Sequence, residues 1–321
     1  MEKYCIGIDI GGTSIKSGLF STKGELVSKW EITTDTSESG NNILIDVADA
    51  IISVLKNDEI NFHQIEGIGM GVPGPVKTDG LVERCVNLGW SRIYPAKRLS
   101  EIIKEKTGVY IRCETGNDAN VAALGELWQG AGKGHKDMMM FTLGTGVGGG
   151  LILNGRIHEG AHGTAGEVGH MKVSDVEKEK CNCGAQGCLE QYSSATGIVR
   201  IAKHILDKSK EDSALRLISG DFTAKDVCNL AKEGDTIAYK AINAACRKLG
   251  KAMSIVSMTL DPEIYLIGGG VSRAGEFLRE LTEKHYKEFT PLLSEADKAK
   301  VSLACLGNDA GIYGAAYLVL V

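Results

Sequence analysis

Proline is scarce in this sequence, with 5 among 321 residues, and no low-complexity stretch separates one part of the chain from another. A chain of this length can form two domains with sizeable cores. Because no linker is visible, we expect the domain boundary to lie in short hinges near Ala119 and Gly307. The 41 glycines therefore predict tight turns and close backbone approaches, and not disorder.

Long runs of basic residues are also missing, and the formal net charge is −5. This argues against nucleic acid as a main partner. No apolar run is long enough to span a bilayer, and Met1-Glu2-Lys3 leads into an expected strand without the features of a signal peptide. Six of the nine cysteines are scattered, which suits a reducing compartment better than a disulfide framework. We expect a cytoplasmic protein with no membrane partner.

The other three cysteines lie together in the segment 160–190. It reads GAHGTAGEVGHMKV, then a charged stretch, then CNCGAQGCLE. Cys181, Cys183 and Cys188 have the spacing C-x-C-x4-C, and His170 lies shortly upstream. Zinc prefers four tetrahedral thiolate and imidazole ligands, and a glycine-rich loop with few apolar side chains can be held by such a metal. The pattern predicts a structural zinc site, with unconnected thiols beside a surface histidine as the alternative.

Two carboxylates in this segment are not needed by zinc. Glu167 precedes His170 by three residues, and Glu190 follows Cys188 by two. A metal that fixes the loop also fixes these carboxylates, and rigid carboxylates with an imidazole are good hydrogen-bond partners for a polyhydroxylated ligand. We therefore favour a binding site over two solvated surface charges.

The chain opens with an expected antiparallel meander whose first turn reads DIGGTSIK. Gly11, Gly12 and Thr13 offer backbone N–H groups and a hydroxyl, and Lys16 adds a cation. These are the parts of a phosphate site. Asp9 at the end of the strand could hold Mg²⁺ through water. An ordinary hairpin with glycine at its tip is the alternative.

A second meander repeats the first, with the sequence LGTGVGGGLILNG. An expected strand at 138–143 leads into a glycine-rich turn over 144–150. Such a repeat predicts two facing lobes that clasp a nucleotide. Another glycine run, Gly268-Gly269-Gly270, follows an expected strand at 263–267 and would let a flat or anionic group approach the backbone. A plain turn between strand and helix is the alternative there.

Asn117 and Asp118 stand where an expected strand at 109–113 gives way to a helical pattern. An aspartate at the start of a helix is most often an N-cap. A carboxylate at the carboxyl edge of a sheet is also well placed as a general base. The residues alone leave both interpretations open.

Several of these segments together resemble a known family. DIGGTSIK, GVPGPV, NDANVAALGE, LGTGVGGGLILNG, EGAHGTAGEVGH, CNCGAQGCLEQYSSATG and IGGGVSRAG are similar to motifs of the ROK family of sugar kinases and repressors. The similarity runs from about Gly7 to Tyr313, and NLGW and LGNDAG resemble the bacterial glucokinases of the family. The resemblance implies an α/β, two-lobe actin-like ATPase (ribonuclease-H-like) fold with an interlobe cleft and a zinc loop. We expect a small lobe of residues 1–118 with 307–321, and a large lobe of residues 119–306.

The resemblance also implies roles for individual residues. Asp118 would be the general base that takes the proton of the sugar 6-hydroxyl, and Asp9 would orient Mg²⁺. Zinc would be bound by His170, Cys181, Cys183 and Cys188, with the second ring nitrogen of His170 left for the sugar. The sugar would be bound by Gly74, Asn117, Asp118, Glu167, His170 and Glu190. The nucleotide would be held by Asp9, Gly11, Gly12, Thr13, Lys16, Gly144, Thr145, Gly146, Gly268, Gly269 and Gly270. Thr115-Gly116 departs from the family pattern, where many members carry glutamate directly before the asparagine.

The implied reaction transfers the γ-phosphoryl group of ATP to the 6-hydroxyl of glucose, with Mg²⁺ and structural Zn²⁺ as cofactors. Kinases for N-acetylmannosamine, N-acetylglucosamine, fructose or allose share most of these residues, so the hexose stays open. A sugar-sensing regulator is less expected, because Asp9 leaves no room before it for a helix-turn-helix. A zinc-stabilised assembly or chaperone ATPase is disfavoured by the carboxylates beside the metal loop. A homodimer is the default for the family.

Overall fold

The structure, a computed structural model, describes residues 2–321. The chain divides into two compact units. Unit 1 comprises Met1–Gly134, Gly150–Ala165 and Leu306–Val321, and unit 2 comprises His135–Gly149 and Gly166–Cys305. Strands and helices are mixed along the chain, which confirms the expected α/β class. Among the described residues, no helix is long and apolar enough to cross a membrane.

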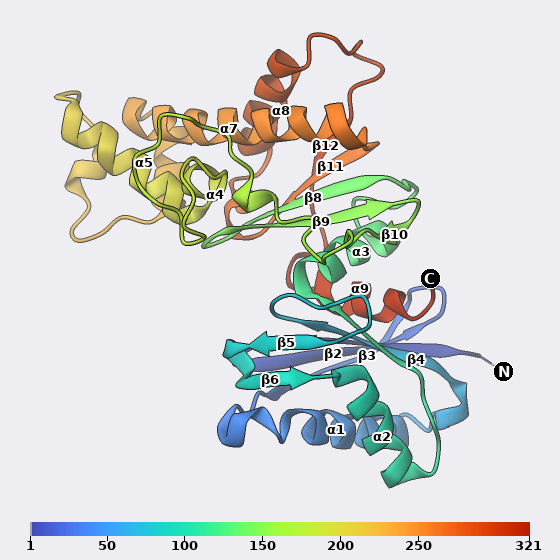
Figure 1. The fold of residues 1–321 in the computed structure, drawn as a ribbon. Helices are drawn as coiled ribbons and strands as arrows, with labels where there is room; N and C mark the ends of the chain where they lie inside the picture. Colours follow the sequence, from blue (N-terminus) through green and yellow to red (C-terminus); the bar gives the residue numbers. More distant parts are fainter. Residues whose placement is uncertain (1) are drawn as a thin grey trace. The chain divides into compact units, whose positions relative to one another are not determined.

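Unit 1 is built on a five-stranded sheet with the strand order β3-β2-β1-β4-β7 (Figure 1). Its principal elements are β1 (Tyr4–Ile10), β2 (Ser14–Ser21), β3 (Leu26–Thr33), α1 (Ile43–Asn57), β4 (Ile65–Val72), β5 (Val82–Cys85), β6 (Trp90–Ile93), α2 (Pro95–Thr107), β7 (Cys113–Asn117), α3 (Asp118–Gln129) and α9 (Ala310–Leu318). The first three strands form the expected antiparallel meander, whereas β4 pairs with β1 and β7 in parallel. The pair β5-β6 forms a separate hairpin.

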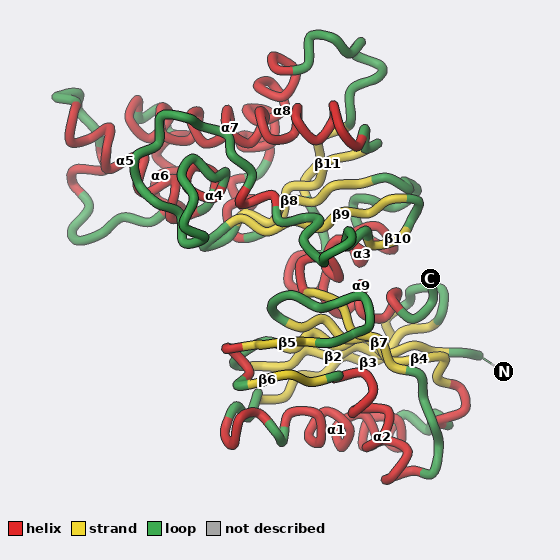
Figure 2. The backbone as a smooth tube through the Cα atoms, viewed as in Figure 1, coloured by secondary structure: helices red, strands yellow, loops and turns green. Residues whose placement is uncertain are grey.

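The two faces of this sheet are covered differently. Alternate β1 residues Ile6, Ile8 and Ile10 are buried in a cluster with the apolar stripe of α1 and residues of α2, and Figure 2 shows these helices on one face. On the other face the strands carry glycine. A Cβ on Gly7 would lie 1.8 Å from the carbonyl oxygen of Ile312, and one on Gly69 would lie 1.8 Å from that of Ala315. Helix α9 therefore rests directly on the strand backbone.

Helix α3 crosses α9 at equally close range. A Cβ on Gly125 would lie 2.2 Å from the carbonyl oxygen of Ala310, and one on Gly314 would lie 1.6 Å from that of Val121. Glycine is needed at both positions because any side chain would separate the helices. The same packing places Gly311 of α9 against the carboxylate of Asp9, from which a Cβ would be 2.7 Å away. The ends of β1, α3 and α9 are thereby brought together.

The other five-stranded sheet has the order β10-β9-β8-β11-β12. The remaining main elements are β8 (Met138–Leu143), β9 (Val147–Leu153), β10 (Arg156–Ile157), α4 (Glu190–Ser193), α5 (Ala195–Lys208), α6 (Ala224–Lys232), α7 (Thr236–Leu260), β11 (Ile264–Gly268), α8 (Glu276–Phe289) and β12 (Lys300–Leu303). The long helix α7 is the centre of the helical layer of unit 2 and packs against α5, α6 and α8. Buried hydroxyls link it to β11 and to α8, since Ser257 hydrogen-bonds to Tyr265 of β11 at 2.7 Å and to Tyr286 of α8 at 2.9 Å.

Two local expectations from the sequence were wrong. The strand before α3 is Cys113–Asn117 and not 109–113, because the parallel register with β4 starts at Cys113 while Tyr110 is 66% exposed. The glycine-rich run after β8 is also mostly strand, because β9 already begins at Val147. Glycine there serves close packing, since a Cβ on Gly150 would lie 2.4 Å from that of Ala123.

The expected lobe boundaries at Ala119 and Gly307 stay a prediction. The compact unit that contains β1–β7 also includes all of α3 and residues 150–165. Helix α3 belongs to this unit because it packs closely across α9. Near its carboxyl end, α3 carries the fully buried Glu126, whose carboxylate accepts hydrogen bonds from the backbone N–H groups of Ala131 (2.9 Å) and Leu306 (2.7 Å).

Candidate functional site

The four predicted zinc ligands lie together in unit 2. His170, Cys181, Cys183 and Cys188 place their ligand atoms within 4.8 Å of one another. The Sγ atoms of Cys183 and Cys188 are 3.7 Å apart, and so are Cys181 Sγ and His170 Nδ1. With Zn–S bonds of about 2.3 Å and a Zn–N bond of about 2.0–2.1 Å, neighbouring ligands of a tetrahedral ion are roughly 3.5–3.8 Å apart. The geometry is therefore compatible with a zinc site.

The loop around this cluster is shaped by turns and backbone hydrogen bonds. Gln191 Oε1 accepts hydrogen bonds from the N–H groups of Gly187 (2.8 Å) and Cys188 (3.1 Å). Gly187 has a φ of +84°, and a Cβ there would lie 1.9 Å from the carbonyl oxygen of Ser174. Arg200 forms a 2.7 Å ion pair with Glu177 and lowers the pKa of that carboxyl to about 2. Polar contacts thus help to shape the loop that carries the cysteines.

Glu190 and the turn that carries His170 both pack on the start of β9. Glu190 Oε2 accepts a hydrogen bond from Val147 N–H (3.1 Å), and a Cβ on Gly146 would lie 2.2 Å from the same oxygen. A Cβ on Gly169, within the 3-10 turn Val168–His170, would lie 2.0 Å from the carbonyl oxygen of Val147. Because Nδ1 of His170 faces Cys181, the ring presents Nε2 away from the cluster.

The remaining predicted sugar ligand of unit 2 is Glu167. It lies directly before this turn, and its backbone carbonyl accepts a hydrogen bond from His170 N–H (3.1 Å). Glu167 and His170 are both exposed, and Glu190 is half-buried. Unit 2 thus brings the three predicted sugar ligands together around the cysteine cluster and the start of β9.

A cavity of about 580 Å³ opens in unit 2 beside the turn between β8 and β9. This volume lies in the range of small-molecule sites. Three residues predicted from glycine patterns line it: Gly144, Thr145 and Gly270. The start of α5 holds this turn with two hydrogen bonds. Ala195 N–H donates to Gly144 O (2.8 Å), and Thr196 Oγ1 donates to Thr145 O (2.9 Å).

Gly268 and Gly269 do not line this cavity. A Cβ on Gly269, which has a φ of +82°, would lie 2.5 Å from the carbonyl oxygen of Leu143. A Cβ on Gly268 would lie 2.6 Å from the side chain of Met140. These glycines serve the close approach of β11 to β8. The predicted contact of Gly268 and Gly269 with the nucleotide stays a prediction.

Other lining residues of the cavity were missed by sequence reasoning. They are Ala195, Thr223, Ala224, Lys225, Cys228, Asn229, Val271, Arg273 and Ala274. Most of them come from α6 and from the segment after β11, which are far from the glycine turn along the chain. No local pattern marks α6 as part of a site, so only its position in the fold reveals it.

In unit 1, the side chain of Asn117 caps helix α3. Its Oδ1 accepts hydrogen bonds from the N–H groups of Ala119 (3.0 Å) and Asn120 (3.2 Å). Its Nδ2 donates to Gly74 O and to Asp118 Oδ1, both at 3.0 Å. Asp118 is the first residue of the helix and is exposed. The cap is therefore Asn117, and the carboxylate of Asp118 is oriented at the positive end of the helix dipole.

Asp9 is half-buried, and its carboxyl is affected by the charge of Asp118. Burial, with a smaller contribution from the charge of Asp118, raises the pKa of Asp9 to about 6, whereas Lys16 lowers it. Lys16 stands directly opposite Asp9 in the β1-β2 register. Two carboxylates that influence each other at the ends of β1 and α3 make this region of unit 1 suited to bind a cation or to accept a proton.

The predicted phosphate turn connects β1 with β2. Gly11 N–H donates to Ser14 O (3.0 Å), and Thr34 Oγ1 donates to Gly11 O (2.6 Å). Gly12 and Thr13 are exposed at the tip. Unit 1 therefore brings together Asp9, Asn117, Asp118 and Gly74 by electrostatic or hydrogen-bonded contact, with the glycine turn directly after Asp9.

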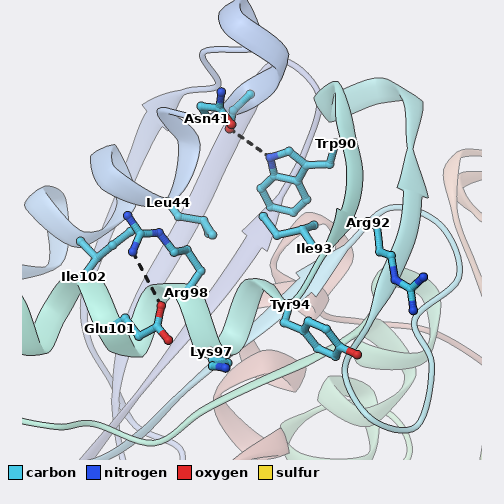
Figure 3. Close-up of a pocket in the computed structure, with 11 residues that line it drawn as sticks. Asn41, Leu44, Trp90, Arg92, Ile93, Tyr94, Lys97, Arg98, Glu101 and Ile102 are labelled. Carbon is cyan, nitrogen blue, oxygen red and sulfur yellow. Dashed lines mark hydrogen bonds and ion pairs between the residues drawn. The ribbon is translucent and has the colours of Figure 1, made fainter.

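Unit 1 also has a cavity of about 390 Å³ that no sequence pattern predicted (Figure 3). Leu44, Ile93 and Ile102 contribute apolar walls, and Arg98 pairs with Glu101 at 3.7 Å on its rim. Trp90 closes it and donates from Nε1 to Gly40 O (3.0 Å). None of the predicted site residues lines this cavity.

Comparison with solved structures identifies the fold class. A ROK hexokinase from Thermus thermophilus superimposes with a TM-score of 0.80 at 29% identity, covering 99% of this chain and 97% of the other. A ROK family glucokinase from Streptomyces griseus, solved in complex with glucose and AMPPNP, gives a TM-score of 0.71 at 32% identity, covering 98% of each chain. The fold is the mixed α/β fold of the ROK sugar kinases.

Sequence comparison agrees with this class over nearly the whole chain. The model of the ROK family matches residues 5–321. A glucokinase from Halalkalibacterium halodurans is 42% identical over 99% of this chain and 95% of its own length. The chain belongs to the ROK family.

Proposed function

We propose that this protein is an ATP-dependent glucokinase that converts glucose and ATP to glucose 6-phosphate and ADP. The full-length similarity to a glucokinase at 42% identity supports the reaction. The main structural support for the chemistry lies at the start of α3. There Asn117 caps the helix, and the side chain of Asp118 is exposed. A carboxylate in that position can act as the general base of a phosphoryl transfer.

In unit 1, Asp118 takes the proton of the sugar 6-hydroxyl as the oxygen attacks the γ-phosphorus. The hydrogen bonds from Asn117 Nδ2 and from Ala119 N–H (2.8 Å) hold Asp118 Oδ1 in place. Asp9 would hold Mg²⁺, which when bound offsets the charge of the phosphate groups. Gly12 and Thr13 offer backbone N–H groups and a hydroxyl to the phosphates, Gly11 closes the turn through its own N–H to Ser14 O (3.0 Å), and Lys16 adds a positive charge.

In unit 2, the cavity beside Gly144, Thr145 and Gly270 suits the adenosine part of the nucleotide, because it is concave and mostly apolar with a few polar groups. Glu167, His170 and Glu190 bind sugar hydroxyls. Zinc would be held by the three thiolates and His170 Nδ1, and when bound it makes the loop rigid. His170 then couples the metal to the sugar through its second nitrogen.

Several finer features belong to the same proposal and rest on family membership. They are Mg²⁺ as the cation of the nucleotide, the homodimer as the assembly, and the cytoplasm as the location. The two-lobe arrangement with residues 1–118 and 307–321 in the small lobe is also part of the proposal.

A coupled assay that detects ADP release tests the function directly. Purified protein is supplied with Mg-ATP and in turn with glucose, fructose, allose, N-acetylglucosamine and N-acetylmannosamine. We expect the highest kcat/KM for glucose and little ADP release without sugar. A higher value for another hexose would move the assignment to that sugar. No sugar-dependent ADP release with any hexose would reject the kinase.

A further inference from the structure

The turn between β5 and β6 lies against the predicted phosphate turn of unit 1. This turn, Val86–Leu88, has a 3-10 conformation and is closed by Gly89. A Cβ on Gly12 would lie 3.4 Å from the carbonyl oxygen of Asn87 and 3.6 Å from Asn87 Cβ. Asn87 is exposed, as is Gly12. The side chain of Asn87 therefore starts beside the tip of the glycine turn and has solvent to extend into.

The same turn begins directly after Cys85, whose thiol is sensitive to the charge of Asp118. Burial and the charge of Asp118 raise the pKa of the Cys85 thiol, whereas the backbone N–H groups of Leu88 and Asn87 lower it. The charge of Asp118 therefore acts on the Cys85 thiol, and the thiol accepts hydrogen bonds from the backbone N–H groups of the turn. Asn87 therefore lies beside Gly12, and it follows Cys85, whose thiol responds to the charge of Asp118, by two residues.

Buried residues on both sides hold this turn in place. Leu88 is fully buried, and Trp90 donates from its indole nitrogen to Gly40 O (Figure 3). The segment that accepts this bond is strained, because Glu38 and Ser39 both have positive φ. A Cβ on Gly89 would lie 3.1 Å from the backbone of Ser39. Non-glycine residues with positive φ cost free energy and persist where the surrounding structure fixes them.

The side-chain amide of Asn87 can donate hydrogen bonds to a phosphoryl group in this region without adding charge. Asn87 borders the proposed phosphate turn, and the nearby carboxylates of Asp9 and Asp118 would repel a phosphoryl group when they are ionised. A neutral amide donates two hydrogen bonds without adding charge that would capture Asp118 in an ion pair. Preorganised donors aimed at developing charge contribute strongly to phosphoryl transfer.

We propose that Asn87 is a further substrate-contacting residue of this enzyme, whose side-chain amide donates a hydrogen bond to the phosphoryl group during transfer. The proposal rests on the proposed function, since it assigns Asn87 to the same reaction. It adds a contact from the β5-β6 hairpin to the glycine turn and to Asp118.

The test compares Asn87→Ala and Asn87→Asp with the matched control Val86→Ala, whose exposed side chain (72%) lies in the same turn but has no donor. We expect kcat to fall roughly 100-fold in Asn87→Ala and further in Asn87→Asp, with KM for ATP and glucose within about twofold of the wild type. Val86→Ala should keep the wild-type kcat. Equal kcat in Asn87→Ala and wild type would overturn the proposal, and so would a rise of KM without loss of kcat.

A second measurement does not depend on sugar turnover. The melting temperature is recorded with Mg-ADP alone and with Mg-ADP plus aluminium fluoride, which mimics the transferring phosphoryl group. We expect Asn87→Ala to respond to Mg-ADP as the wild type does but to lose most of the additional shift from fluoride. An unchanged fluoride shift would count against the contact. Failure of the proposed function appears separately, as wild-type protein without sugar-dependent ADP release.

Discussion

The side-chain amide of Asn117 donates a 3.0 Å hydrogen bond to the carbonyl oxygen of Gly74. This bond ties the start of α3 to the loop that follows β4. The same side chain caps the helix with its oxygen. The position of Asp118 is therefore set by its neighbour and by a loop far away in the sequence, and this relation makes the role of Asp118 testable.

Replacing Asp118 with Asn should remove the base without disturbing its surroundings. The amide oxygen can still accept the hydrogen bond from Ala119 N–H, so the helix start keeps its geometry. We expect kcat to fall by about 10²–10⁴ while glucose affinity, measured by calorimetry, changes little. Asp207→Asn, an exposed change on α5, is the control and should leave kcat unaltered. Undiminished turnover in Asp118→Asn would reject the assignment.

Replacing Cys183 with Ser should remove zinc. Cys183 is exposed, so the change creates no cavity in the core. We expect about one equivalent of zinc in the wild type by elemental analysis and nearly none in the variant, together with a lower melting temperature and a higher KM for glucose. Cys305→Ser, which alters another exposed cysteine outside the cluster, should retain the metal. Wild-type protein that is fully active and stable without zinc would contradict this prediction.

Replacing Asp9 with Asn should change stability in a pH-dependent way. The pKa of Asp9 is raised from 3.8 to about 6 in the native state, so between about pH 4 and pH 6 the native state binds more protons than the unfolded state. The contribution of Asp9 to stability therefore falls as pH rises through this window. In magnesium-free buffer we expect Asp9→Asn to be more stable than wild type at pH 7, by at most about 3 kcal/mol, and equally stable near pH 4.

Urea unfolding at several pH values measures this difference. Activity should move in the opposite direction, because the variant loses the carboxylate proposed to orient Mg²⁺. A stability difference that is the same at pH 4 and pH 7 would show that the native pKa of Asp9 is not raised.

Replacing Glu126 with Ala should destabilise unit 1. The buried carboxylate accepts hydrogen bonds from Ala131 and Leu306, which adjoin the points where the chain leaves and re-enters this unit. Removing it leaves two half-buried N–H groups without this acceptor, and we expect a loss of roughly 2–3 kcal/mol in the free energy of unfolding. Glu105→Ala on the exposed side of α2 is the control, with a change below about 0.5 kcal/mol. Similar unfolding curves for the two variants would contradict the prediction.

Replacing Gly146 with Ala should weaken sugar binding. The new Cβ would lie 2.2 Å from Glu190 Oε2 and must displace that carboxylate from Val147 N–H. We expect KM for glucose to rise about tenfold or more. An unchanged KM for glucose would show that Glu190 does not bind the sugar from its present position.

Sequence patterns predicted elements well wherever the signal was local. The antiparallel start β1-β2-β3 was confirmed, and so was the apolar stripe of α1, because alternation and helical periodicity report directly on which face is buried. The strand before α3 was misplaced by four residues at its start, since hydrophobicity at 109–111 competes with a register that β4 imposes from outside the segment. The sequence predicted a turn for the glycines of β9, because the packing of Gly150 against Ala123 is not visible in the sequence.

The sequence by itself determined the class of fold, the family, and the group of thiols and imidazole suited to zinc. These depend on residues that lie close together in one segment or on motifs in a fixed order. Only the tertiary structure decided that Asn117 and not Asp118 caps α3, that Asp9 lies against Gly311, and that Asn87 borders Gly12. The first depends on which of two adjacent side chains turns back to the helix N–H groups, which the residue types alone leave open. The other two join segments far apart in the chain, and only packing of the strands, helices and turns brings them within contact distance.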